Sequence, residues 1–256
     1  MIRTLSLVAA VGFVLCIGCV AAAFAIAGGP FGIRDWAMVH AGDWDSHRHH
    51  GRHADRDEMR QDDERAFDGP HATRDFAWSG GDLLNVEVPA DIVFTQGPKA
   101  KLTIAGPQDA LDHLVVRDGR IGTDRGFYDG DRLKIVMTAP DVRRFDLSGS
   151  QNLVVEGYKQ ERLELDISGS AQVSAKGAAK LVVLDIAGSG DADLEQLATE
   201  DAQIDISGSG STKVGPKKSA KIDVSGDGEV TLTAKPDKLT TDISGSGHVS
   251  QPGPPT

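Results

Sequence analysis

The sequence contains only two cysteines, Cys16 and Cys19, and both lie within the first twenty of its 256 residues. The rest of the chain therefore offers no disulfide, no thiol nucleophile and no cysteine ligand for zinc. Aromatic residues are also scarce, at 5% of the sequence, whereas there are 30 glycines. This composition disfavours a globule packed around bulky rings.

Positive charge is the second deficit. The chain has 27 Lys and Arg residues against 38 Asp and Glu residues, which gives a net charge of −11. A protein that binds nucleic acid neutralises phosphates with a basic surface, so the acidic balance argues against a nucleic-acid partner. The length is sufficient for one large domain or two small ones with a buried core.

Residues 5–27 carry neither a charge nor a proline. As a helix they would span about 34 Å, enough to cross a hydrocarbon core of about 30 Å. We therefore expect one N-terminal transmembrane helix, with residues 1–4 as a cytoplasmic tip and the body outside the cytoplasm. Two alternatives place the body on the same side of the membrane. These are a signal peptide cleaved after residue 27 and a lipoprotein motif at residues 16–19.

Residues 28–75 hold six of the eight histidines among many charges of both signs. Such a segment buries too little apolar surface to offset the entropy of ordering, so we expect a flexible juxtamembrane linker. Its imidazole cluster could bind Zn²⁺ or Ni²⁺ or sense pH. The alternative is a solvated spacer, since no H-E-x-x-H spacing is present. The cluster comprises His47, His49, His50 and His53.

A five-residue motif, Asp-Leu-Ser-Gly-Ser with small variations, occurs six times at intervals of 18 to 20 residues. Self-similarity at this period is typical of solenoids, in which each repeat covers its apolar face with its neighbours. The motif aspartates are Asp146, Asp166, Asp185, Asp205, Asp223 and Asp242. The motif glycines are Gly149, Gly169, Gly188, Gly208, Gly226 and Gly245.

Within each repeat apolar and polar residues alternate, as in residues 163–174, which predicts strands with one buried face. The sequence thus predicts an all-β, single-stranded β-solenoid over residues 76–250. Its rungs have about 19 residues, are regular over 141–250 and are less regular over 76–140. Each glycine is expected at an inward position at a bend, where no Cβ fits or φ is positive. The proline-rich residues 251–256 would protect the open edge.

Stacking of the repeats predicts an outward ladder of aspartates about 4.8 Å apart. The repulsion between neighbouring carboxylates is about 0.9 kcal/mol in water, so the ladder is tolerable without a bound ion. Two interpretations remain open for these residues. The Asp and Ser side chains could accept hydrogen bonds from backbone N–H groups at the corner. Alternatively, the ladder could bind Ca²⁺ or a glycan.

No catalytic motif accompanies the repeat. The glycine-rich stretches lack the spacing of a phosphate-binding loop, and His113 and His248 are not placed beside a G-x-S-x-G motif. We therefore expect neither an enzyme nor a cofactor.

Two segments ahead of the repeats carry a family resemblance. Residues 84–97 (LNVEVPADIVFTQG), then 101–106 (KLTIAG) and the D-[LI]-S-G-S-[GA] rungs, resemble the bacterial GIN domain over residues 76–250. That family is described as "putative auto-transporter adhesin, head domain". The resemblance implies a β-solenoid on bacterial cell envelopes, with no catalytic residues and no established ligand.

Together these features predict a membrane-tethered, non-catalytic binding module of the bacterial envelope, adhesin-like in architecture. Its partner would be a glycan or an envelope protein, and the oligomeric state is open. One alternative is an envelope-stress sensor or scaffold that binds another membrane protein. Another is a carbohydrate-active enzyme, because a ladder supplies carboxyl pairs at the roughly 5–9.5 Å separations that glycosidases use.

Overall fold

The computed structural model describes residues 71–125 and 130–253. The expected transmembrane span at 5–27 and the histidine cluster His47, His49, His50 and His53 lie outside the described residues. Within the described residues, no helix has the length and apolar character needed to cross a membrane.

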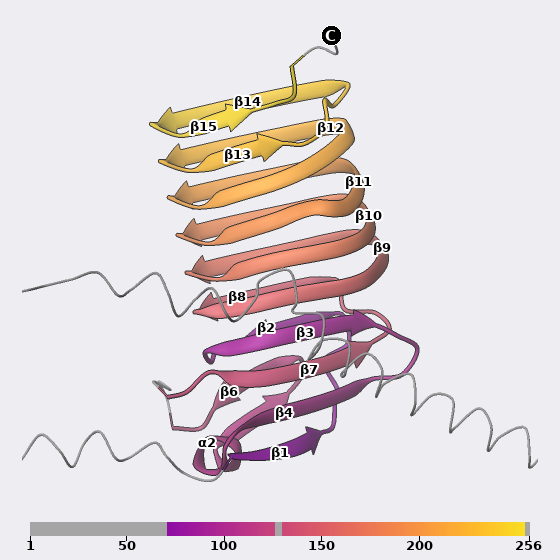
Figure 1. Ribbon diagram of the computed structural model, residues 1–256, viewed down its shortest axis with the longest axis vertical. Helices are drawn as coiled ribbons and strands as arrows, with labels where there is room; N and C mark the ends of the chain where they lie inside the picture. The colour runs from indigo at the N-terminus through magenta and orange to yellow at the C-terminus, as the bar shows by residue number, and fades with distance from the viewer. Residues whose placement is uncertain (1–70, 126–129, 254–256) are drawn as a thin grey trace, which may run out of the picture. The chain divides into compact units, whose positions relative to one another are not determined.

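The described strands form one 15-stranded sheet that winds into a solenoid (Figure 1). Its N-terminal part contains seven strands and one short helix. They are β1 (His71–Phe76), β2 (Leu83–Val86), β3 (Ala90–Gln96), β4 (Lys101–Pro107), α2 (Gln108–Asp112), β5 (Leu114–Arg117), β6 (Arg120–Thr123) and β7 (Leu133–Ala139). The pairs β1–β4, β4–β7 and β5–β6 are antiparallel, and this explains why repeats are not visible here.

The C-terminal part consists of long strands that bend around the rungs and pair in parallel. They are β8 (Arg144–Gly149), β9 (Gln151–Gly169), β10 (Gln172–Gly188), β11 (Asp191–Gly208), β12 (Ser211–Gly226), β13 (Glu229–Leu232), β14 (Lys238–Gly245) and β15 (His248–Ser250). The predicted solenoid is confirmed. In β9 to β12, one long strand curves around most of each rung.

The alternation in sequence produces the core directly. In β9, Leu163, Leu165 and Ile167 point inward and are at most 1% exposed, while Glu164 and Asp166 point outward. Because the rungs are in register, each inward residue packs on its counterparts above and below. One continuous apolar core therefore runs through both parts of the solenoid.

Three rings lie in the core where the two parts meet. Phe145 of β8 packs edge-on against Phe94 of β3, with 5.2 Å between ring centroids, and lies 6.5 Å from Tyr158 of β9. The Tyr158 hydroxyl donates to the carbonyl oxygen of Arg162 at 2.9 Å. Burial raises the pKa of Tyr158 far above its ordinary value, so the hydroxyl stays protonated.

The N-terminal boundary of the solenoid differs from the expectation. Residues 71–75 were expected in the flexible linker, but they belong to β1, which begins at His71. The reason is that Ala72, Arg74 and Phe76 alternate with exposed residues and turn toward the interior, so the strand pairs with β4. The linker prediction for 28–70 stays a prediction.

The motif glycines have a different role from the predicted inward position. All six have φ between +119° and +137°, as the positive-φ alternative required. They are half-exposed or exposed, however, and a Cβ would not point into the core. From Gly169 onward it would come within 2.2 to 2.5 Å of the carbonyl oxygen of the preceding motif glycine. The glycines thus allow close stacking of the rungs at the bend.

Candidate binding face

The six motif aspartates lie in register on the outer face of consecutive rungs, from β8 to β14. The predicted ladder is confirmed as a geometric feature. It extends further than the motif does, because Asn85 of β2 lies beside Asp146 and Arg120 of β6 lies beside Asn85. The column therefore begins with a basic and an amide residue before it becomes acidic.

A second column of hydroxyl groups runs beside the carboxylates, two residues further along each strand. It contains Ser148, Ser168, Ser207, Ser225 and Ser244, with Ala187 in the position between Ser168 and Ser207. The two columns together define what we call the Asp–Ser face. It presents acceptors and donors at the spacing of neighbouring strands, about 4.8 Å.

Two of the ladder carboxylates, those of Asp146 and Asp223, have a polar side-chain partner. The Asn85 side-chain amide donates to Asp146 at 2.7 Å, and the Lys221 ammonium lies 2.6 Å from a carboxylate oxygen of Asp223. Within the described part of the chain, the carboxylates of Asp166, Asp185 and Asp205 have no hydrogen bond or ion pair. These three residues form an unneutralised stretch across the middle rungs.

The proposed hydrogen bonds between ladder side chains and corner N–H groups are not found in residues 71–125 and 130–253. The corner N–H groups bond to the neighbouring rung instead. The N–H groups of Ser170 and Ser189 each donate to a motif glycine carbonyl at 2.8 Å, and that of Ser209 does so at 2.9 Å. Because the glycine carbonyls satisfy these donors, the carboxylates are left facing solvent.

The electrostatic environment disfavours charge in the middle of the ladder. Partial burial, followed by the neighbouring Asp146 and Asp185, raises the pKa of Asp166 above its ordinary value. Partial burial and the nearby Asp205 raise the pKa of Asp185. Both effects penalise the ionised carboxylate.

These shifts predict a dependence of stability on pH. A folded-state pKa above the unfolded value means that the folded chain binds the proton more tightly. The resulting stability is fully present below the unfolded pKa, about 4, and is lost as the pH rises through the raised pKa. The double variant Asp166→Asn, Asp185→Asn should therefore melt higher than the wild type at pH 7, by at most about 2 °C, because both side chains are exposed and solvent screens their repulsion. Its melting temperature should also change less between pH 7 and pH 4, as thermal unfolding followed by circular dichroism would reveal.

Asp223→Asn is the matched control, since this carboxylate is already paired with Lys221. It should bring no gain at pH 7. A double variant whose melting temperature follows the wild-type pH profile would contradict the prediction.

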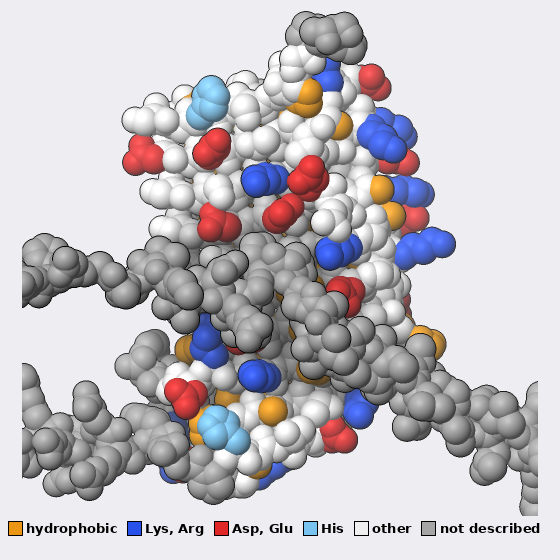
Figure 2. Space-filling model, in the orientation of Figure 1, with side chains coloured by type: hydrophobic (Ala, Val, Ile, Leu, Met, Phe, Trp, Pro, Cys, Tyr) orange, Lys and Arg blue, Asp and Glu red, His pale blue; other side chains and the backbone are white. Residues whose placement is uncertain are grey.

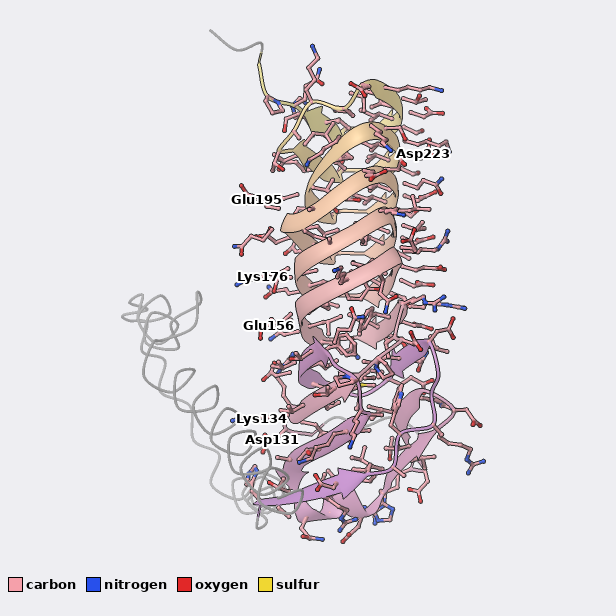
Figure 3. All side chains as sticks on the ribbon, turned by 90° about the vertical axis from the view of Figure 1, so that its right-hand side faces the viewer. Asp131, Lys134, Glu156, Lys176, Glu195 and Asp223 are labelled. Atoms are coloured by element: carbon pink, nitrogen blue, oxygen red, sulfur yellow. The ribbon has the colours of Figure 1, made fainter. Side chains whose placement is uncertain are left out.

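Charges are arranged differently elsewhere on the rungs. In Figure 3, Lys134, Glu156, Lys176 and Glu195 follow one another along one edge, with alternating sign, while Asp223 lies on the other side. Figure 2 likewise shows acidic and basic side chains interspersed along the right-hand edge of the rungs. Elsewhere on the described rungs, ion pairs join Lys180 to Glu161 at 2.7 Å and Lys218 to Glu200 at 2.6 Å. The unneutralised acidic stretch is thus a distinct feature of the Asp–Ser face.

Neither a metal centre nor a deep cleft accompanies this face in the described residues. No group of three His, Cys, Asp or Glu side chains there is placed to hold a metal ion. A shallow hollow lies at the β5–β6 turn, lined by Val115, Arg117, Asp118 and Arg120. The ladder is a flat array of exposed oxygens, a surface suited to contacting an extended partner.

Sequence reasoning missed Asn85 and Lys221, the side-chain partners of Asp146 and Asp223. Asn85 was recognised as part of a strand, but the apolar-polar-apolar pattern of residues 84–86 was not aligned with that of residues 145–147. That pattern is the signal that could have placed Asn85 beside Asp146. Lys221 stands two residues before Asp223, so strand alternation alone places both on one face.

The described residues form a β-solenoid whose regular rungs pair in parallel and carry an exposed, repetitive Asp–Ser face. The chain belongs to the family described as "Putative auto-transporter adhesin, head GIN domain", which matches residues 82–236. No curated protein is significantly similar to it.

The solved structures that match this chain include two putative adhesins. A putative adhesin from Bacteroides fragilis NCTC 9343 has 18% sequence identity and a TM-score of 0.58, covering 71% of this chain and 97% of its own. A putative adhesin from Parabacteroides merdae ATCC 43184 has 15% identity and a TM-score of 0.49, covering 73% of this chain and 98% of its own. The first similarity supports the assignment of the fold.

Proposed function

We propose that this protein is a non-catalytic, adhesin-like binding module of the bacterial envelope, tethered to the membrane through residues 5–27 with its solenoid outside the cytoplasm. The Asp–Ser face is its binding surface. The observation that carries this proposal is the unneutralised stretch of Asp166, Asp185 and Asp205 beside a column of serine hydroxyls.

The chemistry of this face suits a polyhydroxylated ligand. Carboxylates accept hydrogen bonds from sugar hydroxyls, and serine hydroxyls both donate and accept. The repeat offers this pair of groups on successive rungs, except that Ala187 replaces the serine on the rung of Asp185. A polymer with repeating units could therefore engage several rungs at once and gain from multivalency. We therefore favour an envelope or surface glycan as the partner. The family description, which names adhesins rather than enzymes, agrees with a binding role.

The test compares the intact, detergent-solubilised protein with the variant Asp185→Asn, Asp205→Asn on a glycan array. We expect the wild type to bind a defined glycan class and the variant to lose at least tenfold in affinity. The melting temperature should not fall, because neither carboxylate forms a hydrogen bond or ion pair in the described part of the chain. The matched control is Glu156→Gln, Glu195→Gln, which removes two carboxylates from the mixed-charge edge (Figure 3) and should bind normally.

A pull-down from solubilised envelopes with the same proteins distinguishes the alternatives. A blank array together with one co-purifying membrane protein would replace the glycan proposal with a sensor or scaffold role. Loss of folding in the Asp185→Asn, Asp205→Asn variant would instead assign the ladder a structural role.

A further inference from the structure

The two ends of the solenoid are finished differently. At the N-terminal end, the short helix α2 buries Ala110 and Leu111. Arg74 of β1 ties this helix to the sheet by donating to the Leu111 carbonyl at 3.1 Å and pairing with Asp112 at 2.6 Å. At the other end, β14 and β15 form the last layer of the stack (Figure 1). Here β14 pairs only with β12, so among the described residues its second edge has no partner.

This last rung exposes side chains that are core residues one rung earlier. Leu239 and Ile243 are 36% and 41% exposed. Their counterparts in β12, Ala220 and Val224, are 2% and 3% exposed. An open strand edge with exposed apolar residues is a template for pairing with another strand.

The protection expected from the proline-rich tail does not extend to this strand. Pro252 follows β15, the three-residue strand of the last rung, whereas the eight residues of β14 contain no proline. Every residue along the outer edge of β14 therefore has a main-chain N–H group.

We propose that β14 pairs antiparallel with β14 of a second copy of this chain, about a two-fold axis through Thr241. This register sets Leu239 opposite Ile243 of the partner subunit, so the exposed apolar residues of both copies bury each other. Lys238 then lies diagonally across from the partner's Asp242, within reach of its long side chain. Because of the two-fold symmetry, this pairing of Lys238 with the partner's Asp242 occurs twice in the dimer.

The charge pattern favours a second copy over an unrelated strand. Lys238 and Asp242 are the charged residues of β14, and they have opposite signs at positions that antiparallel self-pairing brings together. A two-fold contact also closes on itself, because the open edge of β14 in each copy is covered by that of the other.

The experiment uses charge reversal in the full chain in detergent, with mass measured by light scattering across a dilution series. The wild type should be a concentration-dependent dimer. Lys238→Asp and Asp242→Lys should each weaken dimerisation about tenfold, because each places like charges together twice. An equimolar mixture of the two variants should regain wild-type affinity, since opposite charges then face each other across the two-fold axis.

Two further variants separate pairing from misfolding. Ile243→Asp should abolish the dimer, whereas Val136→Asp, at a valine that is 55% exposed on β7, should leave it intact. Each variant should keep the wild-type circular dichroism spectrum. A monomeric wild type, single variants that dimerise normally, or a mixture that stays weak would each overturn the proposal. If residues 5–27 held the dimer instead, the single variants would dimerise normally.

Discussion

Replacing Gly208 by Ala is expected to lower the free energy of unfolding by about 4 kcal/mol. Two costs contribute. A non-glycine residue at a positive φ costs about 1–3 kcal/mol, and here φ is +137°. The new Cβ would also approach the carbonyl oxygen of Gly188 to 2.2 Å. Overpacking of this kind typically costs about 1–3 kcal/mol, and a backbone oxygen cannot rotate away as a side chain can. Chemical denaturation of both proteins would measure the loss.

Gly149 provides a control with the same backbone conformation. Its φ is +126°, but no motif glycine lies below it. A methyl group added there would meet first the side-chain amide of Gln151, at 3.4 Å, which is an ordinary van der Waals contact. Gly149→Ala should therefore show the conformational cost alone, about 2 kcal/mol. Equal losses at Gly149 and Gly208 would mean that the approach of the rungs contributes nothing.

Replacing Phe145 by Ala should cost about 3–5 kcal/mol, the usual range for a fully buried ring. Phe145 is 0% exposed and contacts rings on both sides of the junction between the irregular strands and the regular rungs. The cavity would be hard to fill because the backbones around it are fixed by the parallel ladders. The melting temperature should fall by roughly 10 °C.

The same variant tests whether the two parts of the solenoid unfold together. If the rings couple them, the wild type unfolds in one transition and Phe145→Ala broadens or splits it, as calorimetry would detect. Val136→Ala, at an exposed valine in the same sheet, should change the stability by less than about 0.5 kcal/mol. A Phe145→Ala protein that melts within about 2 °C of the wild type would argue against coupling at this junction.

The regular rungs were predictable from sequence because each contains a copy of the Asp-Leu-Ser-Gly-Ser motif, which aligns it with its neighbours. Asp, Gly and Ser recur at fixed places, so a single periodicity gives strand direction, register and the outward column at once. The same argument offered a positive φ as one of two reasons for a glycine at position 208. It did not show that the missing Cβ faces the neighbouring carbonyl, because that depends on the direction in which the chain turns at the bend.

The N-terminal strands contain no copy of this motif. Antiparallel pairing of β1 with β4 and of β4 with β7 depends on contacts between segments whose sequences are unrelated. Gln151 illustrates the difficulty. Its position in the rung corresponds to that of Ala171, yet it is buried and its side-chain amide donates to the carbonyls of Val86 and Val88, both at 3.1 Å. A polar residue among apolar ones reveals neither its burial nor its distant partners.

The positions of the ladder carboxylates were predicted from sequence, but the differences in their electrostatic surroundings were not. Periodicity placed the six carboxylates on one face, but it treated them as equivalent. Asn85 and Lys221 make them unequal, and one of these residues comes from a strand outside the repeats. Which carboxylates keep an unscreened charge therefore depends on the tertiary structure.

The in-register stacking of identical glycines and serines makes each rung an exchangeable module. The N–H groups of Ser170, Ser189, Ser209 and Asp227 each donate to the motif glycine carbonyl of the preceding rung, at 2.8 to 2.9 Å. Rungs that are not neighbours therefore offer the same hydrogen-bonding groups at the bend. Duplication or loss of a whole repeat could lengthen or shorten the molecule without new packing solutions. The length of the solenoid, and the number of carboxylates it displays, can thus change with the number of repeats while the sequence of each one is preserved.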